Sequence, residues 1–154
     1  MEDKKNIIKQ LHSLAQLDAD AYHAYGQAMD KVEHVAIRDQ LGVYRDDHRR
    51  HFDELSSQIR SMGGDPPDFS KDFKGYFIEG FTSLRSATGT KGALEAMQTN
   101  EKMTNKNYND ASSRSDLPPE IHSMLVSFYQ DEQQHLRFVE QALKERAWEV
   151  QETV

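Results

Sequence analysis

The chain has 154 residues, no cysteine and a formal net charge of −7 at pH 7. A chain of this length can bury the core of one domain, so we expect a single domain over residues 1–154 with its core at about residues 6–148. The lack of cysteine excludes disulfides, zinc ribbons and thiolate-bound iron, and the acidic balance argues against nucleic-acid binding, which needs a basic patch. There is no signal-like start and no apolar run of membrane-spanning length, so we predict a cytoplasmic protein without membrane contact.

The first half of the chain carries two long segments whose apolar residues recur in steps of three and four, the period of an amphipathic helix. We expect the first helix at about residues 6–33, after a frayed start over residues 1–5. The second, at about residues 35–62, follows with almost no linker, so the two helices should be antiparallel neighbours. The sequence Gly-Gly-Asp-Pro-Pro at residues 63–67 ends the second helix, with glycine at the C-cap and proline after it.

The second half repeats this arrangement after a long crossover at residues 69–89. Five crossover residues have the spacing of a short helix, namely Phe73, Tyr76, Phe77, Phe81 and Leu84. A third long helix is expected at about residues 90–113 with Thr90 as its N-cap. A fourth opens at Pro118 and Pro119, which suit a first helical turn, and runs to about Trp148. The prediction is an all-α fold, an antiparallel four-helix bundle whose crossover joins helices two and three.

Six ionisable residues stand on the apolar stripes, at positions where core residues are expected: Asp18, His48, His51, Glu101, Glu132 and His135. Burying an ionisable group is costly unless another group pairs with it. The stripes carry no lysine or arginine between these positions. One explanation for all six is a metal ion; the alternative is a metal-free core in which protonated histidines pair with the carboxylates.

The unusual positions also repeat between the two halves of the chain. Asp18 and Glu101 are 83 positions apart, as are Tyr25 and Tyr108, while His48 and Glu132 are 84 apart, as are His51 and His135. Each half therefore contains an acid, a tyrosine seven residues later, and a pair that ends in histidine. Tyr25 and Tyr108 either hydrogen-bond the carboxylates of the site or simply pack. The remaining histidines lie off the stripes and are expected to be exposed: His12, His23, His34 and His122.

Four-helix bundles place metal sites among inward-facing side chains, and residues three apart on a helix reach one centre together. The order of Asp18, the His48–His51 pair, Glu101 and the Glu132–His135 pair resembles the ferritin-like superfamily of di-iron carboxylate proteins. A tyrosine seven residues after each acid is similar to the rubrerythrin branch. The Gly-Gly-Asp-Pro-Pro stop and the aromatic crossover are similar to small bacterial ferritin-like domains of unknown function. The resemblance covers about residues 6–143.

The resemblance implies a role for each residue: Asp18 and His51 would bind one metal, Glu101 and His135 the other, and Glu132 would bridge them. Iron is the implied cofactor, with manganese and zinc as alternatives that also accept carboxylate and imidazole ligands. Asp18 departs from the glutamate usual in the family. His48 stands in place of its second bridging glutamate, and a neutral imidazole offers one nitrogen where a carboxylate offers two oxygens. We therefore expect two unequal metal positions, with His48 serving only the Asp18 side, and an affinity that falls below about pH 6 as histidine protonates.

Three functions follow as hypotheses. The leading one is a mono- or dinuclear iron protein of the ferritin-like type, acting in redox chemistry on peroxide or oxygen. Since the chain has no cysteine, it lacks the usual rubrerythrin electron-transfer domain, and redox turnover would need an external electron donor. The alternatives are an iron-storage or ferroxidase subunit, and a metal-free bundle that acts in stress response or protein interaction. Metal ions are the expected partners, and a homodimer is left open.

Overall fold

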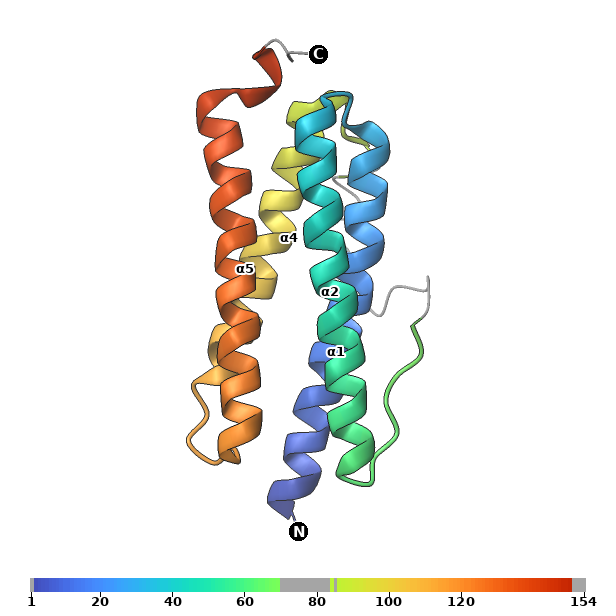
Figure 1. The fold of residues 1–154 in the computed structure, drawn as a ribbon, viewed down its shortest axis with the longest axis vertical. Coiled ribbons are helices and arrows are strands. Elements are labelled where there is room, and N and C mark those ends of the chain that lie inside the picture. The colour runs from blue at the N-terminus through green and yellow to red at the C-terminus, as the bar shows by residue number, and fades with distance from the viewer. Residues whose placement is uncertain (1, 70–83, 85, 151–154) are drawn as a thin grey trace.

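The computed structural model describes residues 2–69, 84 and 86–150 (Figure 1). In this part of the chain the regular elements are all helical: α1 (Glu2–Lys31), α2 (Val35–Ser61), α4 (Gly89–Ser112), α5 (Pro119–Glu145) and the short 3₁₀ helix η1 (Ala147–Glu149). The all-α prediction is confirmed, with four long helices packed side by side as in a four-helix bundle. Nowhere in the described residues is a helix long and apolar enough to cross a membrane.

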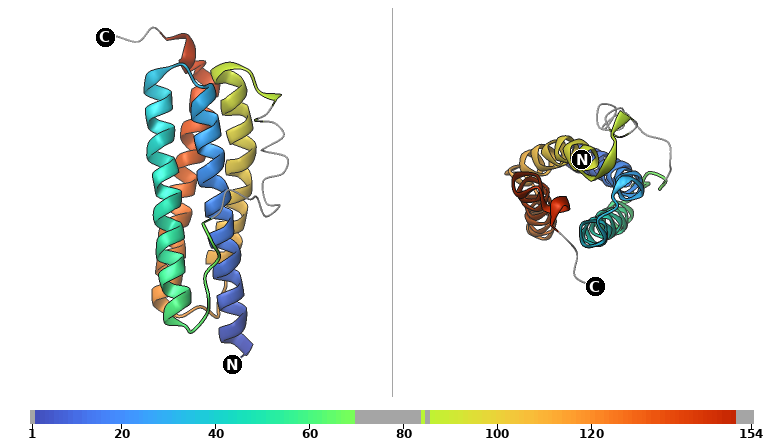
Figure 2. Two further views of the ribbon diagram at one scale, coloured as in Figure 1. Left: turned by 90° about the vertical axis from the view of Figure 1, so that its right-hand side faces the viewer. Right: turned by 90° about the horizontal axis from the view of Figure 1, so that it is seen from above.

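The four helices pack as two antiparallel pairs, α1 with α2 and α4 with α5 (Figures 1 and 2). Helices α1 and α4 contact each other and join the two pairs, whereas α2 and α5 have much less contact. The predicted short helix in the crossover, with Phe73, Tyr76, Phe77 and Phe81, lies outside the described residues, but Leu84 is buried. The bundle therefore has three well-packed sides and one loosely packed seam, between α2 and α5.

The apolar stripes of the sequence are the buried faces of the helices. On α1 and α4 the buried leucines Leu11 and Leu94 correspond at an offset of 83 residues. On α2 and α5 the offset of 84 relates Leu41 to Leu125. The two halves of the chain thus present equivalent buried faces to one core.

Several predicted helix ends differ from the structure. Helix α1 is already formed at Glu2, so the predicted frayed start was wrong for residues 2–5. Helix α4 begins at Gly89 with Thr88 at the N-cap, and the Thr90 hydroxyl instead accepts a hydrogen bond of 3.3 Å from the backbone N–H of Glu33. This bond ties the α1–α2 turn to the start of α4. Helix α5 ends at Glu145 because Arg146 adopts a left-handed conformation, with φ of 50°.

The histidines off the stripes are less exposed than predicted. His34 is half-buried, and its Nδ1 accepts a hydrogen bond of 3.3 Å from the Ile37 backbone N–H, which caps α2. His12 and His23 are also half-buried, whereas His122 is exposed as expected. The prediction of exposure overlooked the use of a histidine side chain as an N-cap.

Replacing either of two glycines by alanine tests this packing, and the expected changes in stability have opposite signs. A Cβ on Gly64 would lie 2.8 Å from Ile8 Cγ2 and 3.1 Å from Ile59 Cγ2, whereas a Cβ on Gly26 would meet nothing within 4 Å. Gly64→Ala should destabilise the fold by about 1–3 kcal/mol through overpacking. Gly26→Ala, inside α1, should stabilise it by about 0.5–1 kcal/mol. Urea unfolding of both variants measures this, and equal effects would contradict the described contact between the Gly64 turn and α1.

Candidate metal centre

All six ionisable residues singled out on the stripes are at most 1% exposed. Their potential ligand atoms fall into two overlapping groups, within each of which these atoms lie within 4.8 Å of one another. The first group is Asp18, His48, His51 and Glu132, and the second is His48, Glu101, Glu132 and His135. The structure therefore brings the six side chains together at one place. Their role as metal ligands stays a prediction.

His48 belongs to both groups and lies between them. Its Nδ1 is 2.7 Å from Asp18 Oδ1, and its Nε2 is 3.7 Å from Glu101 Oε1. The two ring nitrogens thus face the two equivalent acids of the two halves. The expectation that His48 would bind metal only on the Asp18 side stays a prediction, and it did not consider the direction in which each nitrogen points.

Each buried tyrosine donates a hydrogen bond to the acid of the other half. The Tyr25 hydroxyl on α1 donates to Glu101 on α4, and the Tyr108 hydroxyl on α4 donates to Asp18 on α1. Burial and the neighbouring carboxylates raise the pKa of both phenols well above 10, so both keep their donor proton. Of the two alternatives for these tyrosines, the structure has the hydrogen-bonded one.

Two further carboxylates, which sequence reasoning missed, hold the outer nitrogens of His51 and His135. The Nε2 atom of His51 is 2.8 Å from Asp131 Oδ2, and that of His135 is 2.8 Å from Asp47 Oδ2. Because an ionised carboxylate only accepts, each Nε2 carries the proton and each Nδ1 is turned toward the cluster. Asp47 and Asp131 are also 84 positions apart, so the repeat contained the signal for them.

An aromatic ring packs on each of these two histidines. Tyr44 lies 4.2 Å from His135 and Phe128 lies 4.0 Å from His51, measured between ring centroids. Tyr44 and Phe128 are again related by the offset of 84. Each imidazole is thus fixed by a carboxylate at its outer nitrogen and by a ring on its face, both of which limit its rotation.

On each of the three cluster histidines, the neighbouring charges oppose the effect of burial on the pKa. Burial alone would lower the pKa of His48, but the charge of Glu132, the hydrogen bond to Asp18 and the nearby Glu101 carboxylate raise it to about 9. The pKa values of His51 and His135 also rise well above 6.5 against burial, chiefly because of the charges of Asp18 and Glu132 respectively.

The two acids that the tyrosines contact shift in the opposite direction. Burial raises the pKa of Asp18 and Glu101, but charges and hydrogen bonds from the histidines lower both overall. Without metal, the cluster is therefore a set of imidazolium and carboxylate groups that stabilise one another's charged forms.

Several polar atoms of the cluster have no hydrogen-bond partner among the described residues although they are shielded from solvent. They include both carboxylate oxygens of Glu132, Nε2 of His48 and Nδ1 of His135. Buried polar atoms in native proteins nearly always have partners. Glu132 and His48 belong to both ligand groups, and the other nitrogen of His135 is already bonded to Asp47. A cation at this point would meet oxygen and nitrogen donors, a set that suits iron, manganese and zinc.

The raised pKa of His48 gives a prediction for the metal-free chain. A histidine whose folded pKa is raised stabilises the fold fully below its unfolded value of about 6.5 and loses that contribution as pH rises through the folded value. Stability of chelator-treated protein should therefore fall between about pH 6.5 and 9. His48→Gln should reduce this fall, while His122→Gln, at an exposed position of α5, should leave it unchanged. The checks are ¹⁵N NMR titration of the imidazoles and thermal unfolding against pH; a neutral His48 at pH 7 would contradict the assigned charge.

Comparison with known proteins gave one family. Residues 6–114 match the family described as a domain of unknown function (DUF2383), whereas a search of curated proteins found no match. The matched region contains Asp18, His48, His51 and Glu101, and it ends before α5, which carries the other two residues of the cluster. Since the match spans well over half of the sequence, the chain belongs to the DUF2383 family.

Proposed function

We propose that this chain is a single-domain, ferritin-like protein that binds one or two metal ions, with iron as the natural one, in the buried cluster. The proposal is carried by Glu132, which is fully buried, lies in both ligand groups, and has no hydrogen-bond partner at either oxygen among the described residues. A carboxylate in this position is costly to bury without a cation. Its Oε1 lies 3.3 Å from His48 Nδ1 and its Oε2 lies 3.2 Å from His135 Nδ1, and two oxygens with different neighbours suit a bridge between two ions.

The two groups divide the ligands between two ions. Asp18 and His51 would hold one ion, Glu101 and His135 the other, and Glu132 would serve both, with His48 between them. Iron bound there would supply one-electron redox chemistry toward oxygen or peroxide, and an external donor would return the electrons. The protein's own residues fix the site. Tyr25 and Tyr108 orient the acids, and Asp47 and Asp131 keep the Nδ1 atoms of the histidines directed inward.

A second candidate is a metal-free polar core in a protein of the interaction or stress-response type. It is favoured by the raised pKa values of three histidines, which let imidazolium ions neutralise the carboxylates. It leaves the Glu132 oxygens without hydrogen-bond partners, which the metal-bound form does not. Metal content therefore separates the two candidates.

The deciding experiment is an anaerobic titration with Fe²⁺, read by metal analysis after desalting. The wild-type chain should retain one or two iron ions, and Glu132→Gln should weaken binding by at least about hundredfold because it removes a charged ligand shared by both positions. Glu95→Gln is the matched control, since Glu95 is exposed on α4. If the wild type retains no iron, manganese or zinc, the metal-free candidate is correct.

Protons should compete with the metal over a wider pH range than the sequence suggested. Ligand histidines must be deprotonated to bind, and the pKa of His48 in the metal-free chain is about 9. Affinity should therefore rise up to about pH 9 and not level off just above pH 6. Iron binding at pH 7 should release protons to the buffer.

Changing His48 to glutamate tests whether the histidine makes the two positions unequal. His48→Glu puts a two-oxygen ligand between Asp18 and Glu101, so iron occupancy should rise toward two per chain, with at least about a tenfold gain at the weaker position. His122→Glu adds the same charge at an exposed position of α5 and should not change occupancy. Two equally tight sites in the wild type would show that His48 does not limit binding.

A further inference from the structure

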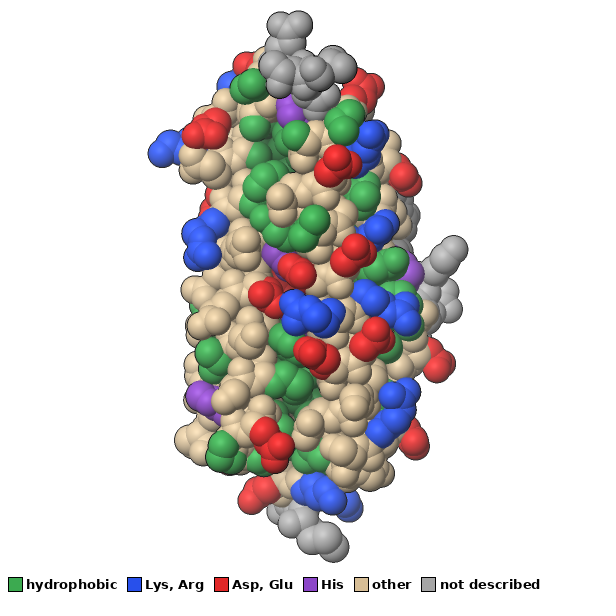
Figure 3. Space-filling view, in the orientation of Figure 1, with side chains coloured by type: hydrophobic (Ala, Val, Ile, Leu, Met, Phe, Trp, Pro, Cys, Tyr) green, Lys and Arg blue, Asp and Glu red, His purple; other side chains and the backbone are tan. Residues whose placement is uncertain are grey.

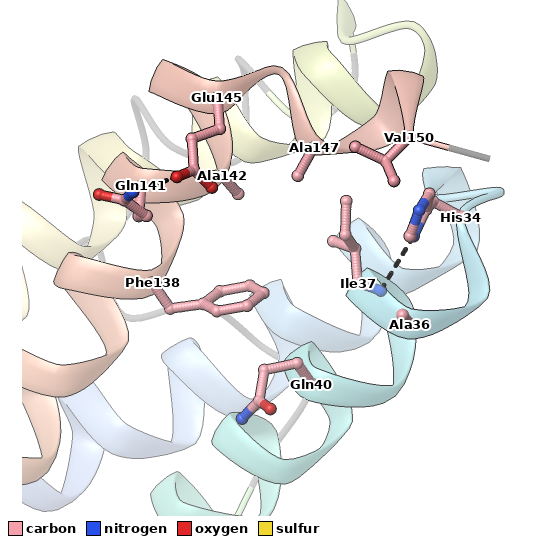
Figure 4. A pocket seen from close by; sticks show the side chains of 10 residues that line it. All are labelled: His34, Ala36, Ile37, Gln40, Phe138, Gln141, Ala142, Glu145, Ala147 and Val150. Atoms are coloured by element: carbon pink, nitrogen blue, oxygen red, sulfur yellow. Dashed lines mark hydrogen bonds between the residues drawn. The ribbon is translucent and has the colours of Figure 1, made fainter. Parts of the chain in front are cut away.

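The seam between α2 and α5 is hollow at three places. Figure 4 shows the hollow at the end of the bundle, about 430 Å³, where Ile37 and Gln40 of α2 face Phe138 of α5. A second hollow of about 540 Å³ continues from it and shares Phe138. A third hollow of about 530 Å³ lies on the other side of the cluster, toward the opposite end of the seam. On the face seen in Figure 3, hydrophobic side chains follow this seam and are interrupted midway by acidic and basic ones.

At the level of the cluster the seam is bridged by polar bonds, beside the ring contacts of Tyr44 with His135 and of Phe128 with His51. Arg50 on α2 donates a hydrogen bond of 2.7 Å to Asp131 on α5 and lies 3.5 Å from Asp47. The side chains of Arg50, Asp131 and Asp47 are 45%, 26% and 27% exposed. Each aspartate in turn holds a cluster histidine. Each of these partly exposed aspartates thus directly contacts one of the fully buried candidate ligands.

The hollows on either side come equally close to the cluster. The 540 Å³ hollow is lined by Tyr44, whose ring packs on His135, and the 530 Å³ hollow by Phe128, whose ring stacks on His51. The opposite side of the cluster is covered by α1 and α4, which pack against each other and against their partners. A metal ion has to reach ligands that are at most 1% exposed, and the side that needs least disruption to open is this seam.

We propose that the α2–α5 seam at Asp47, Arg50 and Asp131 is the entrance by which a metal cation reaches the cluster, and that Arg50 is its latch. The inference rests on the proposed metal-binding function. Arg50 supplies the positive charge between the two aspartates in the closed state and repels an incoming cation. When it swings out, Asp47 and Asp131 offer two carboxylates to the cation, and the same two residues release the outer nitrogens of His135 and His51 as the helices part.

The test is the rate of metal movement, measured anaerobically with Fe²⁺ by stopped-flow loading and by release to excess chelator. Arg50→Gln should speed both loading and release by about three- to tenfold, the size expected for a half-exposed ion pair, and leave the dissociation constant unchanged. Arg49→Gln is the matched control, because Arg49 is a similarly exposed neighbour that pairs with Asp53 and lies over Phe69. Rates that are equal in Arg50→Gln and wild type would overturn the latch.

A cross-link gives an independent test of the entrance. Ser57 on α2 and Ser123 on α5 are exposed and line the same hollow. The natural sequence has no cysteine, so cysteines introduced at these two positions would be the only thiols. Joining Ser57→Cys and Ser123→Cys with a flexible bis-maleimide should slow loading at least about tenfold relative to the same variant capped by a monofunctional maleimide. Unchanged loading would place the entrance elsewhere. Failure of the wild type to bind any Fe²⁺ would instead refute the metal-binding function, so the two proposals fail in different ways.

Discussion

Charged groups in the middle of this bundle can be buried only as a set. Removing one partner from a buried ion pair costs about 3–5 kcal/mol because it leaves an uncompensated charge, and here six such groups are at most 1% exposed. Asp18 depends on His48 and Tyr108, Glu101 on Tyr25 and the histidines, and Glu132 on a positive charge beside it. Each of the six groups therefore depends on the others for its burial.

The same bonds that orient the cluster also join the two halves of the chain. The tyrosine bonds connect α1 to α4, and the bonds of His51 to Asp131 and of His135 to Asp47 connect α2 to α5. Each half supplies the partner that the other half needs. Since α2 and α5 otherwise have little contact, a change in the charge of the cluster should alter the packing of α2 against α5 more than that of the other helix pairs. The residues that would bind the metal are therefore also the residues that hold α2 and α5 together.

The sequence predicted the helices and the six buried residues because both depend on local spacing, which survives unchanged into the fold. Asp18 and Glu101 stood out since they interrupt an apolar stripe. Asp47 and Asp131 did not, because they lie beside the stripe and look like ordinary surface charges; only the contact across the seam gives them a role. The two directions of His48 and the use of Thr90 by the α1–α2 turn likewise depend on neighbours from other helices, which spacing within one helix does not contain.

The central claim is that the space between Glu132 and its neighbours belongs to a metal ion. Anomalous X-ray diffraction from crystals grown anaerobically with Fe²⁺, recorded on both sides of the iron edge, tests it most directly. We expect an anomalous peak between the Glu132 carboxylate and the Nδ1 atoms of His51 or His135, within about 2.0–2.4 Å of its ligand atoms. A fully occupied polar cluster with no anomalous peak, and with the histidines hydrogen-bonded directly to Glu132, would contradict it.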